Sequence, residues 1–142
     1  MRRAIQKFHV AMKAFIGRDG TLLLVKDSSS GFWELPGGRI DVGEENTPHS
    51  EVLLRELREE LGPDLDVAVQ RPMVSWTKRL WGEDGFVVLV GWRCDYRKGE
   101  VRLSDEHTEF RWVDPESWKA LRMTPADQGT IQQYWDRVEA EG

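Results

Sequence analysis

The sequence predicts an α/β fold in which a mixed β-sheet is covered on both faces by helices. Three observations lead to this prediction. Apolar runs of strand length occur at residues 8–16, 21–26 and 85–94. A helix with both ends marked spans residues 48–61, and a second amphipathic helix spans about 125–139. With 142 residues and no linker or internal repeat, the chain is expected to form one domain over residues 1–142.

The first 38 residues predict a hairpin, a short strand and a glycine turn. The expected elements are strands at 8–16 and 21–26 joined by a turn at 17–20, a polar loop at 27–31, and a short strand at 32–35 that ends before Pro36. Gly37 and Gly38 then predict a sharp turn. Because neither residue has a Cβ, the backbone could approach a ligand there, although an ordinary turn is the better explanation of these glycines taken alone.

The helix at residues 48–61 has start and stop signals in the sequence. Thr47 and Pro48 are typical of an N-cap and a first helical position, and Gly62 followed by Pro63 is typical of a helix end. Leucines repeat at helical spacing on one side, as expected for a helix that packs on a core.

Residues 41–60 are strongly acidic, with seven acids against two bases. On a helical wheel Glu56, Glu59 and Glu60 fall together, on the side turned away from the leucine stripe. Carboxylates about 6 Å apart repel by roughly 3 kcal/mol per pair at an effective dielectric of about 20. A divalent cation with oxygen ligands, such as Mg²⁺, would offset this repulsion. The alternative is an acidic face that only interacts with water.

These residues resemble the signature of the Nudix hydrolases, which reads Gly, five residues, Glu, seven residues, then Arg-Glu-aliphatic-x-Glu-Glu-x-Gly-aliphatic. Gly38 and Glu44 keep the first spacing, and residues 55–62 (RELREELG) keep the second half. Two positions depart from the signature, because ten residues separate Glu44 from Arg55 and Pro63 replaces an aliphatic residue. The three extra residues either lengthen the loop, in which case Glu44 still reaches the helix, or alter the helix start.

The resemblance implies a Nudix-like α/β/α sandwich and an enzyme. Its expected activity is Mg²⁺-dependent hydrolysis of the pyrophosphate linkage in a nucleoside diphosphate derivative, with Mn²⁺ as an alternative cofactor and water attacking a phosphorus atom. The expected partner is therefore a small phosphorylated nucleotide-type substrate. The alternative is a nucleotide-sensing module of the same fold that has no activity.

The resemblance also implies roles for the acidic residues. Glu56, Glu59, Glu60 and the carbonyl of Gly37 would bind the metal, and Glu59 could instead orient or deprotonate the attacking water. Arg55 would hold a glutamate in place, and Glu44 would brace the site from the loop. A further acid from a later loop is expected, for which Glu106 is the first candidate and Glu109 the second; a solvated turn is the competing interpretation.

Substrate-binding residues are less clearly marked. Arg39 follows the glycines and could reach a substrate phosphate, or could instead pair with Asp41. Lys78 and two tryptophans, Trp76 and Trp81, are candidates for contacts with a base. The histidines at positions 9, 49 and 107 are interpreted as surface residues.

The second half of the chain predicts further strands and two helical segments. The expected elements are a strand at 67–76 interrupted at Pro72, a turn at 78–84 with Trp81 at its apex that could form a flap, and a central strand at 85–94. Residues 101–105 and 109–113 flank a short acidic segment, a short helix follows to Leu121, and the last helix places Ile131, Tyr134, Trp135 and Val138 on one face.

Composition limits the partners and the compartment. The net charge of −5 argues against non-specific nucleic-acid binding, and no apolar run is long enough for a membrane span. Cys94 is the single cysteine and is expected in the core, which fits a reducing, cytoplasmic location. The seven tryptophans are compatible with a homodimer interface or with a core.

Overall fold

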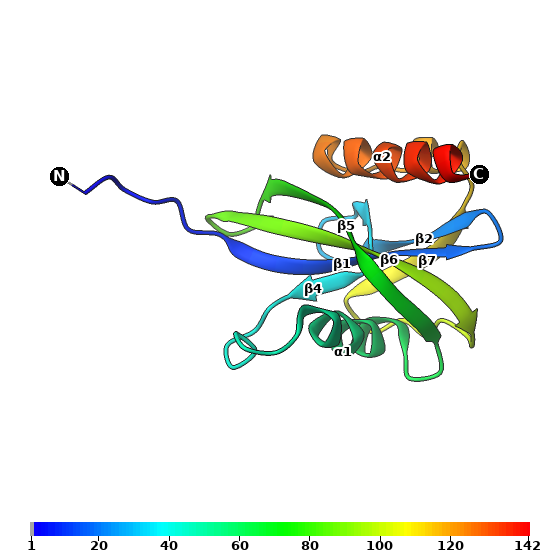
Figure 1. Cartoon of the computed structure of the whole chain (residues 1–142), viewed down its shortest axis with the longest axis horizontal. Helices are drawn as coiled ribbons and strands as arrows, with labels where there is room; N and C mark the ends of the chain where they lie inside the picture. Colours follow the sequence, from blue (N-terminus) through cyan, green and yellow to red (C-terminus); the bar gives the residue numbers. More distant parts are fainter. Residues whose placement is uncertain (1) are drawn as a thin grey trace.

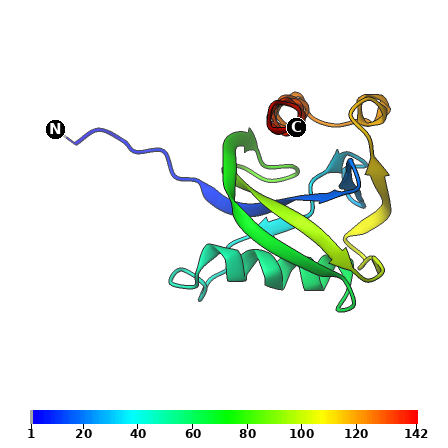
Figure 2. The same cartoon turned by 45° about the vertical axis from the view of Figure 1, so that its right-hand side comes forward.

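The computed structural model describes residues 2–142 and shows one sheet between two helices (Figures 1 and 2). Its elements are, in chain order, β1 (His9–Arg18), β2 (Thr21–Asp27), β3 (Trp33–Glu34), β4 (Gly37–Arg39), α1 (His49–Leu61), β5 (Asp66–Arg79), β6 (Phe86–Lys98), β7 (His107–Val113), a 3₁₀ turn η1 (Ser117–Ala120) and α2 (Pro125–Glu141). The expected α/β class with a mixed, two-sided sheet is therefore confirmed.

The sheet is built around β1. Its strand order is β3-β2-β1-β6-β5, and β4 and β7 pair with β1 and β2. Strands β1 and β6 are parallel, whereas every other pair is antiparallel. The predicted hairpin joins β1 to β2, with Arg18 opposite Thr21 across a two-residue turn. Asp19 and Gly20 both have positive φ angles, as this turn requires.

Each face of the sheet has its own core. Side chains such as Met12, Ile16 and Leu23 pack with Leu53 and Leu57 of α1 on one face. On the other face, sheet residues Phe15, Leu22 and Leu24 pack with Trp118 of η1 and with three residues of α2, namely Ile131, Tyr134 and Trp135. Because β1 is covered on both faces, its sequence is a nearly continuous apolar run. Lys13 is the one charged residue in the buried part of this strand.

Three local predictions were wrong. Gly37 and Gly38 belong to strand β4, because β1 supplies backbone partners on one side of this segment. Strand β5 continues through Pro72, since it is an edge strand and the ladder shifts its register on either side of the proline. Strand β7 begins at His107, inside the acidic segment that was expected to precede residues 109–113.

The ends of the helices follow the sequence in part. Gly62 ends α1 with a positive φ of 92° and donates its N–H to the carbonyl of Arg58. Thr47, however, does not cap this helix, because Pro48 occupies the N-cap position and no side-chain cap bond forms. In α2 the cap is Thr124, whose side chain accepts from the N–H of Asp127. Neither helix in residues 2–142 combines the length and apolar character that a membrane crossing requires.

Packing of α1 on the sheet should contribute strongly to stability. Replacing the fully buried Leu53 with alanine (L53A) leaves a cavity under the helix and is expected to cost about 2–5 kcal/mol in the free energy of unfolding, measured by urea denaturation. V42A is the control, because Val42 is fully exposed and its replacement should change stability by about 0.5 kcal/mol or less. Equal effects of the two changes would contradict the packing shown here.

Candidate functional site

Two glutamates of α1 lie against the glycines of β4. The backbone N–H of Gly37 donates to Oε2 of Glu60 over 2.7 Å. At Gly38, a Cβ atom would lie 2.3 Å from the Glu56 carboxylate, so only glycine leaves room for that side chain. Glu56 and Glu60 are 8% and 3% exposed. The expectation that these acids point away from the packed face was therefore wrong for both, because Gly38 leaves room for Glu56 and the N–H of Gly37 binds Glu60.

Arg55 binds the carboxylates on the outer side of the same helix. Its Nε and Nη2 donate to the two oxygens of Glu44 over 2.6 Å each. Nη2 also lies 2.9 Å from Glu56, and Nη1 donates to Glu59 over 3.1 Å. Glu44 reaches the arginine because the three extra residues lengthen the loop before α1, which begins at His49. The guanidinium thus fixes three carboxylates relative to one another.

Burial makes the two inner carboxylates reluctant to ionise. It raises the pKa of Glu60 to about 9, aided by Glu106 and opposed by Lys13 and by the N–H of Gly37. Burial likewise raises the pKa of Glu56, although Arg55 opposes it. In contrast, hydrogen bonds from Arg55 lower the pKa of Glu44. A cation beside Glu60 would stabilise its charged form.

Glu106, in the segment before β7, lies close to Glu60. Ligand atoms of Glu60, Glu106 and His107 all lie within 4.8 Å of one another. They line an open pocket of about 300 Å³, together with Asp27, Ser28, Ser29, Glu34 and Asp105. Oxygen-rich surroundings of this kind suit Mg²⁺ or Mn²⁺. The second candidate, Glu109, lies elsewhere and pairs with Lys26 at 3.3 Å.

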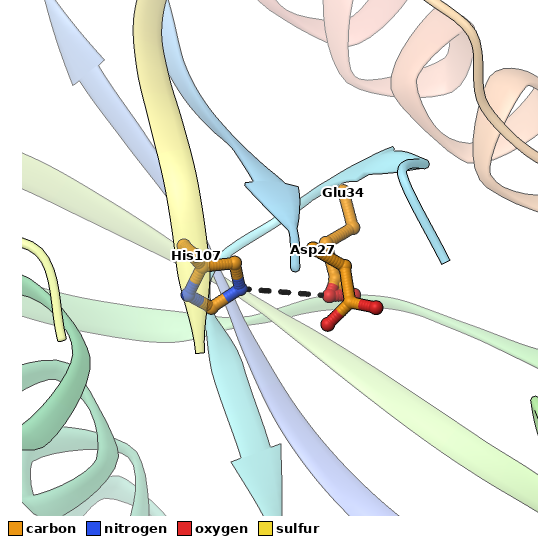
Figure 3. Close-up of side chains that lie close together, drawn as sticks. All are labelled: Asp27, Glu34 and His107. Atoms are coloured by element: carbon orange, nitrogen blue, oxygen red, sulfur yellow. Dashed lines mark ion pairs between the residues drawn. The ribbon is translucent and has the colours of Figure 1, made fainter. Parts of the chain in front are cut away.

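A neighbouring group, Asp27, Glu34 and His107, also brings three ligand atoms within 4.8 Å (Figure 3). His107 Nε2 lies 3.7 Å from Glu34 Oε2. Burial alone would raise the pKa of Glu34, but Lys13, His107 and Lys78 outweigh it and lower this pKa to about 2. The charge of Glu34 is therefore already compensated by the protein. Glu60 lacks that compensation, so the Glu60 and Glu106 side is the better place for a cation.

His107 is buried, which corrects its interpretation as a surface residue. It is the first residue of β7 and pairs with Asp27 of β2, so its ring turns in toward Glu34 (Figure 3). Within the described residues its Nδ1 has no hydrogen-bond partner. His9 is exposed as expected and lies beside Arg39, and His49 is also exposed.

A larger pocket of about 450 Å³ adjoins the acidic one and shares Asp27, Ser29 and Glu34 with it. Its lining is of mixed character, with the aromatic rings of Phe32 and Trp81, the cations Arg39, Lys78 and Arg79, and the acids Asp27, Glu34, Glu83 and Asp127. The ring of Trp81 meets Phe32 edge to face with 5.4 Å between centroids, and most of Trp81 remains exposed. The β5–β6 turn therefore forms one wall of this pocket, next to the acidic group.

Two candidate substrate contacts differ from expectation. Trp76 does not line the pocket, because its ring packs against the core and its Nε1 donates to Asp127 over 3.0 Å. The other oxygen of Asp127 accepts from Lys78 over 2.8 Å. Arg39 lines the pocket and pairs with both oxygens of Glu83 at 3.2 Å, rather than with Asp41, which lies near Arg55.

Sequence reasoning missed three residues of this region, namely Lys13, Glu34 and Asp127. Lys13 had a signal, since a lone lysine in an apolar strand needs buried partners. Asp127 also had one, because an acid in the first turn of a helix is well placed for capping and for pocket contacts. Glu34 had no signal beyond its position before the glycines.

Comparison with known proteins identifies the family. A model of the NUDIX domain matches residues 7–134. The CTP pyrophosphohydrolase of Escherichia coli K12 is 30% identical over 125 residues, which cover 85% of this chain and 87% of that protein. A MutT-like protein of Streptomyces ambofaciens is 36% identical over 101 residues, and the match covers 71% of this chain but 60% of that protein.

Solved structures agree with this assignment. The solution structure of the E. coli ORF135 protein superposes with a TM-score of 0.77 and 27% identity, and the match covers 95% of this chain and 94% of that one. The chain therefore belongs to the Nudix family and is a Nudix-type hydrolase.

The compensated charge of Glu34 leads to a prediction about pH. Its pKa is lowered from 4.5 to about 2, so its stabilisation is present above pH 4.5 and is lost as the pH falls through about 2. At neutral pH, E34Q should cost up to about 3 kcal/mol and should flatten the loss of stability between these two pH values. Urea unfolding at several pH values measures both effects.

The control for this prediction is E109Q, which removes an exposed ion pair with Lys26. It should cost about 1 kcal/mol or less and leave the pH profile unchanged. If E34Q and E109Q give the same profile, the Glu34 carboxylate is not stabilised as described.

Proposed function

We propose that the protein is a nucleotide pyrophosphohydrolase that uses Mg²⁺, or Mn²⁺ in its place, to cleave a phosphoanhydride bond in a nucleoside triphosphate or related nucleoside diphosphate derivative. The observation that supports it most is the position of Glu60, a buried carboxylate with a pKa raised to about 9, beside Glu106 in the acidic pocket that adjoins the larger one. The CTP pyrophosphohydrolase among its relatives makes CTP the first substrate to test.

The donor set fits a hard divalent cation. Glu56 occupies the space that a Cβ atom on Gly38 would fill, Glu60 accepts from the N–H of Gly37, and Glu106 approaches Glu60. In this proposal Glu56, Glu59, Glu60 and the Gly37 carbonyl hold the metal. When bound, the metal would offset the charge of a pyrophosphate and make a nearby water more acidic.

The protein's own groups would then position the reactants. Glu59 is more exposed than Glu56 and Glu60, with 57% of its side chain accessible, and Arg55 holds it from one side. It is placed to orient or deprotonate an attacking water, whose oxygen forms a bond to phosphorus while the bridging P–O bond breaks. Arg55, itself bound by Glu44, would hold Glu56 and Glu59 in fixed positions. Glu106 would add a further carboxylate to the lining of the acidic pocket.

The larger pocket would hold the nucleoside. Trp81 and Phe32 offer faces and edges on which a base can stack, and Asp127, held by Trp76 and Lys78, offers a hydrogen-bond acceptor. Arg39 lies at the same wall and could exchange Glu83 for a substrate phosphate, because exposed ion pairs are weak. The alternative of a sensing module without activity is disfavoured, because the chain carries every carboxylate of the signature.

The first prediction concerns the metal ligands. With Mg²⁺ the protein should release phosphate or pyrophosphate from at least one member of a panel headed by CTP, and EDTA should abolish this. E60Q should lower kcat by at least about 100-fold, because a ligand to the metal is lost. In a thermal denaturation assay, Mn²⁺ should raise the midpoint of the wild type but not of E60Q.

E109Q serves as the matched control in these assays, since Glu109 pairs with Lys26 outside the site. Full turnover by E60Q, or no stabilisation of the wild type by Mn²⁺, would show that the carboxylates have another role.

The second prediction concerns the base. W81A should raise KM by about five-fold or more with a smaller effect on kcat, because a stacking contact is worth roughly 1–3 kcal/mol. F110A removes another exposed aromatic ring, which lies on β7 outside the pocket, and should leave KM unchanged. If both variants behave alike, the β5–β6 turn does not contact the nucleoside.

A further inference from the structure

A buried lysine lies on the central strand beside the acidic group. Lys13 is only 9% exposed, in a strand that is covered on both faces. Its neighbours Met12 and Ala14 face α1, so the lysine projects from the opposite face of β1. A cation removed from water is costly unless it is paired and hydrogen-bonded. The groups that contact Lys13 therefore indicate the role of its charge.

Those partners are all oxygen atoms around β4. The Nζ of Lys13 donates to the carbonyls of Leu35 and Gly37 over 3.2 and 3.4 Å. It also lies 3.9 Å from Oε1 of Glu34, whose other oxygen faces His107 (Figure 3). In the described chain, no other ammonium or guanidinium group is hydrogen-bonded to the backbone of Gly37 or Gly38 in β4.

Gly37 is consequently held at both ends of its backbone. Its N–H donates to Glu60, and its carbonyl accepts from Lys13. One glycine thus connects the buried ammonium to the buried carboxylate with the raised pKa. Its own conformation, with φ of 137°, is one that a side chain would not tolerate, so this connection cannot easily be moved.

We infer that Lys13 is an internal counter-cation of the metal site. It keeps Gly37 and Glu60 in place when no metal is bound, and its fixed charge weakens the affinity of the site for a divalent cation. The reason is electrostatic, because Lys13 and an incoming metal would share the Gly37 carbonyl and the field of the same buried carboxylates. Lys13 is thus a positioning residue that sets how tightly the metal is held. This inference rests on the metal site of the proposed function.

The test compares neutral and charged replacements. K13M removes both charge and hydrogen bonds, K13Q removes the charge but keeps an N–H donor, and K13R keeps the charge. Binding of Mn²⁺ to each protein is measured by isothermal titration calorimetry, and thermal midpoints are measured in EDTA. K13M and K13Q should bind Mn²⁺ at least about five-fold more tightly than the wild type, with K13R within about two-fold. Without metal, K13M should melt at a lower temperature than the wild type.

The outcomes are distinct. Unchanged or weaker Mn²⁺ binding by the neutral variants, in a wild type that binds Mn²⁺, would overturn this inference and leave the proposed function intact. A wild type that binds no Mn²⁺ would overturn both. If the neutral variants fold only when Mn²⁺ is present, the metal has replaced the missing charge, as the inference requires. If they remain unfolded even with saturating Mn²⁺, Lys13 is a structural residue and the inference fails.

Discussion

The burial of negatively charged carboxylates is the constraint on which the arrangement of α1 and β4 depends. Glu56 and Glu60 lie against β4 because α1 buries its leucines on the sheet, Gly38 leaves the space that Glu56 occupies, and Gly37 donates its N–H to Glu60. Burying an uncompensated carboxylate is costly. The protein compensates these carboxylates with the Arg55 guanidinium beside Glu56, the N–H of Gly37 bonded to Glu60, and the nearby charge of the Lys13 ammonium.

This compensation is uneven, and the unevenness has a chemical consequence. Glu34 is flanked by Lys13 and His107, so its charge is stable in the folded state. Glu60 has only the N–H of Gly37 and the field of Lys13, while Glu106 adds a like charge. The group of Glu34 and the group of Glu60 share His107 and line the same pocket, yet only the group of Glu60 still lacks positive charge. Electrostatics therefore separates a structural carboxylate from one that can recruit a cation.

The features that could be predicted from sequence are those that depend on local chemistry. The first hairpin, the body and end of α1 and the amphipathic α2 depend on turn glycines, leucine spacing and caps, all of which are visible in a short window. The family signature implied that Arg55 would hold a glutamate and that Glu44 would brace the site, and the structure bonds these two residues to each other. Strand β4, the burial of His107 and the inward position of Trp76 were not predictable, because each depends on a partner strand or a residue far away in the chain.

The same distinction explains why the insertion before α1 is tolerated. Arg55, Glu56, Glu59 and Glu60 keep their relative positions because the helix sets their spacing, and the β4 glycines are fixed by pairing with β1. The loop between these two rigid parts has only to deliver Glu44 to Arg55, which it does with two hydrogen bonds of 2.6 Å. The entropy of closing a loop grows slowly with its length, so three more residues cost little. What the site requires is therefore the rigid spacing within the helix and the bare backbone opposite it, rather than the length of the segment between them.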